Sequence, residues 1–223
     1  MKKTYVFIFN LYILFVFSMP VFSQTEKTYA LRLGIDISRF SLLLLNPDRK
    51  ALEFSADVEL KKNYIPTIEI GFNNIHLKKD SLYNYTSNGN YYRLGVDYNL
   101  LKPKTIHDKE IFFLGCRYGM SFFNHTVNDI LIKDSYWGNY NGTISPKSSL
   151  AQWIELTGGI RAEVIKNFYF GWSLRARILL HKTKEAQNTI YWIPGYGKGD
   201  AKSAIGFNYS LFYSIPVFKT KIK

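Results

Sequence analysis

FYFGWSLRARI, at residues 168–178, alternates apolar and polar side chains almost without interruption. One parity is aromatic or aliphatic, and the other carries Gly171, Ser173, Arg175 and Arg177. Successive side chains of a β-strand point to opposite faces of the sheet. The segment is therefore predicted to be a strand with one apolar face and one charged face.

The same alternation recurs in seven further segments. They span residues 31–38, 52–60, 64–72, 92–99, 112–122, 154–164 and 206–215. A tilted strand of about 9–11 residues crosses a bilayer, and an even number of strands returns both chain ends to one side. The sequence predicts an all-β fold, an eight-stranded antiparallel up-and-down transmembrane β-barrel in the outer membrane of a Gram-negative cell.

The cations distinguish a barrel from a soluble sandwich, which would also alternate. On the polar parity of these segments every cation is arginine, while lysine is confined to turns, loops and the C-terminal tail. Arginine suits enclosed, bidentate pairing with carboxylates, whereas the open face of a soluble sheet would carry lysine. Aromatic residues such as Tyr64 and Phe122 also lie near segment ends, as in interfacial girdles. Both observations favour the barrel.

The N-terminus has the features of an export signal. A basic start precedes the apolar stretch Val6–Phe17, and small Ser23 fits the position before a signal-peptidase cut. An uncleaved anchor helix is the alternative, but the apolar stretch is short for a membrane span. We therefore expect a signal peptide over residues 1–23 and a single barrel domain over residues 24–223.

Composition limits the partners. Without residues 1–23 the chain has 27 Lys and Arg against 17 Asp and Glu, and its one cysteine, Cys116, excludes an internal disulfide framework. After export, anionic lipid head groups are the expected counter-charge, and no nucleic-acid role is expected. The expected partners are outer-membrane lipid and the export and barrel-assembly machinery, while a surface ligand stays unidentified.

Charged residues on the polar parity are expected to fill the lumen, because eight strands leave an interior that side chains just occupy. The predicted ion-pair network comprises Arg32, Asp36, Glu53, Asp57, Glu59, Glu69, Arg93, Asp97, Arg117, Glu155, Arg161, Glu163, Arg175 and Arg177. A proton or ion path along these residues is the alternative. A structural plug is favoured, because neighbouring strands offer partners of opposite charge.

Connections alternate between tight turns and long segments at 74–89, 123–149 and 181–203, as expected for periplasmic turns and outer loops. The apolar run Leu42–Leu45 is interpreted as a lip helix or a strand extension. Aromatic residues in the long segments form a candidate binding surface, although an interfacial belt would use the same residues. They are Tyr83, Tyr85, Tyr136, Trp137, Tyr140, Tyr191, Trp192 and Tyr196.

No catalytic motif occurs. The four histidines are assigned to loops, without metal-ligand spacing, and no cofactor is implied. The leading hypothesis is a non-enzymatic structural or surface-binding barrel with a plugged polar lumen. A lipid-modifying barrel enzyme, using His125 or His181 beside a loop serine, and a narrow transporter are the alternatives.

Four motifs together resemble an uncharacterised outer-membrane barrel family of Bacteroidota. They are SNGNYYRLGVDYN (87–99), GCRYG (115–119), WIELTGGIRAE (153–163) and GFNYSLFYSIP (206–216). The resemblance covers most of the chain after residue 23. It implies a small barrel of unknown function, without assigned catalytic residues.

Overall fold

A computed structural model describes most of the chain. The described residues are 28–39, 48–60, 63–79, 83–101, 110–132, 140–184 and 190–219. The predicted signal peptide at 1–23 and the Leu42–Leu45 run lie outside them. The barrel unit spans Tyr29–Val217, and the second unit combines Met1–Thr28 with Phe218–Lys223.

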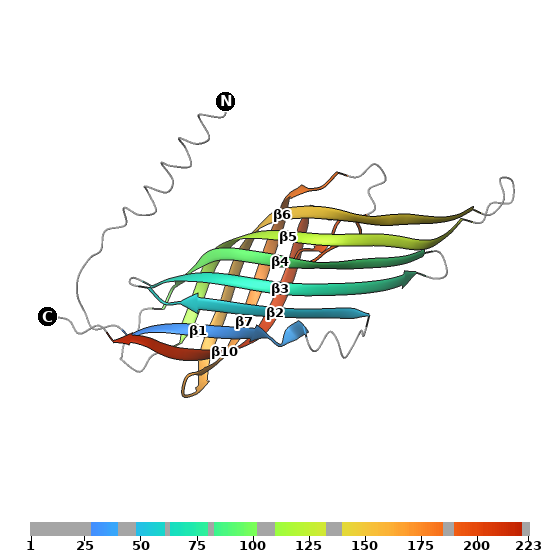
Figure 1. Cartoon of the computed structure of the whole chain (residues 1–223). Coiled ribbons are helices and arrows are strands. Elements are labelled where there is room, and N and C mark those ends of the chain that lie inside the picture. Colours follow the sequence, from blue (N-terminus) through green and yellow to red (C-terminus); the bar gives the residue numbers. More distant parts are fainter. Residues whose placement is uncertain are drawn as a thin grey trace, which may run out of the picture. The chain divides into compact units, whose positions relative to one another are not determined.

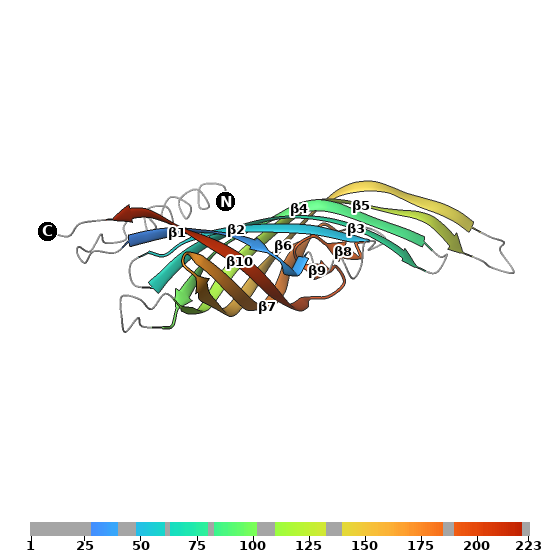
Figure 2. The same ribbon diagram turned by 90° about the horizontal axis from the view of Figure 1, so that it is seen from below.

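Eight strands form one closed antiparallel barrel, as predicted. They are β1 (Thr28–Asp36), β2 (Arg49–Val58), β3 (Tyr64–Lys79), β4 (Tyr83–Asn99), β5 (Ile111–Ile132), β6 (Tyr140–Ile165), β7 (Phe168–Lys182) and β10 (Ser203–Lys219). Their order around the barrel is β1-β10-β7-β6-β5-β4-β3-β2. Figure 2 shows β7 and β10 on one side and β4 and β5 on the other. Two short strands, β8 (Trp192–Ile193) and β9 (Gly197–Lys198), pair separately.

The two parities face as the alternation predicts. On β7, Leu174 points outward and is 48% exposed, whereas the neighbouring Arg175 is 4% exposed. A closed barrel satisfies its backbone hydrogen bonds internally, and an apolar exterior around a charged interior is stable only in lipid. The chain is therefore an outer-membrane β-barrel. Among the described residues, no helix is long and apolar enough to span a bilayer.

The two ends of the barrel differ. At one end, here called the inner end, Asn63 leads from β2 into β3 and Asn167 connects β6 to β7, both with positive φ (68° and 69°). Asparagine tolerates this left-handed conformation, which permits tight reversals. At the opposite, outer end, β3 to β6 extend well beyond the other strands (Figure 1). Short turns are the periplasmic feature of such barrels.

The segments predicted as long outer loops are largely strand. β3 and β4 pair as far as Lys79 and Tyr83, and β5 and β6 pair as far as Ile132 and Tyr140. The loop prediction for 74–89 and 123–149 was therefore wrong over most of both ranges. Their polar composition suggested loops, but polar side chains are also compatible with strands that extend beyond lipid into water.

Cys116 provides a direct test of facing. It lies outward on β5, between Val96 of β4 and Leu156 of β6. We expect Cys116→Arg to lower the unfolding free energy by about 2–4 kcal/mol, because a charge near the bilayer midplane faces hydrocarbon. Urea titration of the protein folded in lipid vesicles measures the change.

Cys116→Leu is the matched control and should leave stability nearly unchanged. The adjacent Gly115 is unsuitable for an inward-facing probe, since a Cβ there would lie 2.1 Å from Asp97 Oδ1. Equal stability of the arginine and leucine variants would contradict the assignment of this parity to lipid.

Candidate functional site

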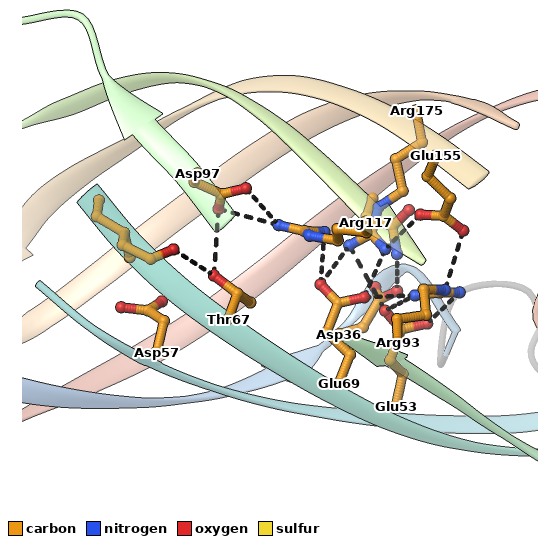
Figure 3. A network of polar contacts seen from close by, with 12 residues as sticks. Asp36, Glu53, Asp57, Thr67, Glu69, Arg93, Asp97, Arg117, Glu155 and Arg175 are labelled. Atoms are coloured by element: carbon orange, nitrogen blue, oxygen red, sulfur yellow. Dashed lines mark hydrogen bonds and ion pairs between the residues drawn. The ribbon is translucent and has the colours of Figure 1, made fainter. Parts of the chain in front are cut away.

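The lumen contains a continuous arginine–carboxylate network. Among the described residues, seven arginines and seven carboxylates make inward ion pairs. The arginines are Arg32, Arg39, Arg93, Arg117, Arg161, Arg175 and Arg177, and the acids are Asp36, Glu53, Asp57, Glu59, Glu69, Asp97 and Glu155. With equal numbers of each sign, these residues balance in charge. Figure 3 shows the central part of the network.

Arg93 lies at the centre of the outer half of the network. Its side chain is fully buried, and its guanidinium lies 2.8 Å from Glu53, 2.5 Å from Glu69 and 3.0 Å from Glu155. A further hydrogen bond runs from Arg93 Nη2 to the carbonyl of Gly195. The planar fork thus joins three carboxylates from three strands to the segment after β8, as arginine geometry permits.

Glu69 continues the network toward the inner end of the barrel. It accepts hydrogen bonds from Arg117 at 2.6 Å and Arg175 at 2.7 Å, and Arg117 also contacts Asp97 at 3.0 Å. Arg161 then bridges Asp97, at 2.5 Å, to Asp57, at 3.1 Å. Because each member contacts at least one opposite charge, the cost of burying these ions is offset along the axis.

Two predicted members occupy the inner rim. Glu59 pairs with Arg32 at 3.3 Å, but its side chain is 34% exposed. Glu163 accepts a hydrogen bond from the backbone N–H of Asn167 at 2.7 Å. Both carboxylates lie near turns, and Glu163 stabilises the β6–β7 reversal.

The predicted network did not include Arg39 and Asn208, which both contact its carboxylates. Arg39 follows the end of β1 and lies 3.4 Å from Asp36 and 3.3 Å from Glu53. Asn208 of β10 donates a hydrogen bond to Asp36. Arg39 falls after the alternating segment, so periodicity gave no signal for it. Asn208 was on the inward parity but carries no charge.

The network leaves little free space. The residual cavity measures about 20 Å³ and lies among Glu53, Glu69, Arg117, Arg161 and Arg175. A single water needs about 10–15 Å³ measured this way, so the cavity has room for about one. This cavity is too small to hold a continuous column of water.

A cluster of aromatic and aliphatic residues, here called the lumen cluster, lies on the outer side of the network. Ile190, Ile193 and Tyr196 pack against inward-facing Tyr91 and Trp153, and all five are at most 3% exposed. Trp153 Nε1 donates to Glu155 at 2.7 Å, and Tyr91 donates from its hydroxyl to Glu53 at 2.5 Å. The segment containing β8 and β9 thus folds into the barrel and contacts the ion pairs through aromatic residues.

The predicted aromatic loop surface was partly wrong. Tyr85 and Tyr196 are 2% and 0% exposed, because Tyr85 lies on the inward parity of β4 and Tyr196 belongs to the lumen cluster. Tyr191 is 39% exposed, and Tyr83 and Trp192 are half-buried. Tyr136 and Trp137, and the side chain of Tyr140, lie outside the described residues.

The histidines lie in strands rather than loops, contrary to the sequence assignment, wherever the structure describes them. His125 is 1% exposed on β5, 6.2 Å from the Tyr85 ring and in register with Ser87. The hydroxyl of Ser87 donates a hydrogen bond to the carbonyl of Trp192, at 3.3 Å. His181 is exposed on β7. Across the described ranges, there is no group of three or more His, Cys, Asp or Glu side chains that could hold a metal ion.

A second, larger cavity opens at the outer end and is called here the outer pocket. Its volume is about 460 Å³, within the range typical of small-ligand sites. Arg39, Arg49, Arg177 and Lys198 line it, together with aromatic, small and aliphatic residues. No carboxylate occurs among its described lining residues.

Comparison with solved structures finds other outer-membrane barrels at low sequence identity. The N-terminal β-barrel domain of Pseudomonas aeruginosa OprF shares 8% identity, with a TM-score of 0.43. A major outer membrane protein from Thermus thermophilus shares 11% (TM-score 0.47), and Ail, the attachment invasion locus protein of Yersinia pestis, shares 7% (TM-score 0.41). Each alignment covers 86% of this chain and 100% of the other.

No curated protein matches the sequence. A family profile does match, over residues 6–220 and therefore almost the whole chain. The chain belongs to the family described as Domain of unknown function (DUF6048).

Proposed function

We propose that the protein is a closed, non-conducting and non-enzymatic outer-membrane barrel whose outer end serves as a binding surface. The observation that carries the proposal is the filled lumen, where balanced ion pairs leave room for about one water. A pore or transporter needs a polar path that can open, whereas these charges are engaged with one another. The outer pocket supplies the binding surface.

The same proposal covers partners and source. Outer-membrane lipid and the export and barrel-assembly machinery are the expected partners, without nucleic acid. The apolar exterior and the mature chain's positive charge support lipid contact. The motif resemblance supports an origin among the Bacteroidota.

Conductance tests the closed lumen. We expect negligible single-channel current when the purified, folded protein is inserted into planar bilayers, because side chains occupy the lumen. A heat-modifiable shift on gel electrophoresis controls for folding before insertion, and protein-free detergent controls for bilayer leaks. A stable, ion-selective open conductance would overturn the proposal.

Lipid analysis tests the enzymatic alternative. His125 is buried beside the Tyr85 and Phe123 rings, and Ser87, its cross-strand neighbour, donates a hydrogen bond to the carbonyl of Trp192. We therefore expect mass spectrometry to find the same outer-membrane acyl composition with and without the gene. A changed acyl pattern that disappears on replacing His125 or His181 by alanine would instead identify a lipid-modifying enzyme.

A further inference from the structure

We propose that the outer pocket is a binding site for a phosphate-bearing ligand. The inference rests on the surface-binding role proposed above, for which it names a site and a ligand class. Two sources share this chemistry, the phosphorylated headgroup of an outer-leaflet lipid and a soluble sugar phosphate.

The pocket carries uncompensated positive charge. Of its four cations, Arg39 and Arg177 are already paired with carboxylates of the lumen network. Arg49 and Lys198 make no ion pair with a described carboxylate, and none lines the pocket in the described part of the chain. Arginine and lysine are the residues that most often bind phosphate, arginine through its bidentate fork.

Arg49 is held in position and has donor capacity to spare. Its guanidinium carbon lies 4.7 Å from the centre of the Trp192 ring, a cation–π arrangement. Arg49 Nε and Trp192 Nε1 are both buried without a hydrogen-bond partner among the described residues. Because neither atom is open to solvent, phosphate would contact the terminal guanidinium nitrogens of Arg49 instead.

β1 is shorter than its two neighbouring strands at the outer end of the barrel. β1 ends at Asp36, Ile35 pairs with Phe54 of β2, and the backbone N–H of Ile37 donates to Tyr209 of β10. The outer parts of β2 and β10 therefore continue past the end of the strand that separates them. Figure 2 shows β1 ending before β3 and β4 at this end.

The pocket lies between these continuing edges. Ala51 of β2 and Ser203 of β10 both line it, and so does Ile205, whose side chain is 79% exposed on the lipid-facing parity. A ligand can therefore place phosphate against Arg49 and Lys198 while its remaining part contacts the outer leaflet or the medium.

Calorimetric titration of the full mature protein, folded in maltoside micelles, tests the site. The probes are glucose 6-phosphate with glucose as its neutral control, and lipid A with its dephosphorylated form. We expect at least one phosphorylated probe to bind about tenfold or more tightly than its control. The probe that binds identifies the source. Failure of both phosphorylated probes to bind overturns the inference.

Paired variants locate the binding. Arg49→Gln combined with Lys198→Gln should weaken binding about tenfold or more, because two charge-assisted contacts are lost. Lys50→Gln combined with Lys202→Gln removes the same charge from neighbouring exposed residues and should leave affinity unchanged. Equal losses in both pairs would show only general charge attraction and overturn the site.

Lys198→Glu provides a variant in which folding is not at risk, since Lys198 is exposed on β9. It should abolish most of the binding, while Lys202→Glu should not, and unchanged affinity in Lys198→Glu overturns the inference. The result is separable from the conductance test. If the bilayer shows no conductance and no phosphorylated probe binds, this ligand is ruled out but the closed lumen is not. If an open conductance is found, the closed barrel is ruled out whatever the pocket binds.

Discussion

Replacing Arg93 by leucine is expected to lower the unfolding free energy by about 3–5 kcal/mol. The guanidinium is fully buried and contacts Glu53, Glu69 and Glu155, each within 3.0 Å. Leucine would leave three buried carboxylates without their shared cation, which costs far more than losing an exposed pair. Urea-induced unfolding in lipid vesicles, followed by tryptophan fluorescence, measures the loss.

Two further variants separate the buried network from a simple change of net charge. Lys166→Leu removes one positive charge from the exposed β6–β7 turn and should have little effect. Adding Glu155→Gln to Arg93→Leu removes one of the carboxylates that has lost its cation, and it should recover part of the lost unfolding free energy. If Lys166→Leu were as harmful as Arg93→Leu, the network would not be the source of the effect.

Strand number and facing could be predicted from the sequence because both depend on a period of two. Leu174 and Arg175 show how directly this works, since adjacent residues face lipid and lumen. Confining arginine to one parity also identified that parity as the enclosed one. These features are local, so they can be predicted without knowing which strands are neighbours or in which register they pair.

Strand ends could not be predicted in the same way. In β4, residues 83–91 are rich in Tyr, Asn, Ser and Thr, a composition shared by loops and water-exposed strands. Their pairing with β3 and β5 decides between the two, and register is a property of two segments at once. The period-two signal is weak where neither face contacts lipid.

The ion-pair partners and the lumen cluster depend on three-dimensional closure. Glu69 and Arg175 are 106 residues apart but share a 2.7 Å hydrogen bond across the lumen. Tyr196 lies in a segment with no alternation, so its burial follows only from the folding of that segment into the barrel. Trp153 was available to sequence reasoning, because it lies on the same parity as Glu155.

Trp153 should therefore hold the closing segment in place, and Trp153→Ala is expected to lower the unfolding free energy by about 3–5 kcal/mol. The ring is fully buried, lies 5.8 Å from the Tyr196 ring and donates to Glu155. Alanine would leave a cavity beneath Tyr196 and remove the hydrogen bond to a buried carboxylate. The segment containing β8 and β9 should then detach more often from the lumen.

Limited trypsin digestion of the folded Trp153→Ala variant should reveal this detachment as faster cleavage at Lys198 and Lys202, read by mass spectrometry. Trp172→Ala is the matched control, because Trp172 faces lipid on β7 and is 39% exposed. It loses the same side chain without opening a cavity in the lumen, so its digestion rate should stay at the wild-type value. If both variants were cleaved equally fast, or if Trp153→Ala were as resistant as wild type, Trp153 would not anchor the segment, and the lumen would be closed by the ion pairs alone.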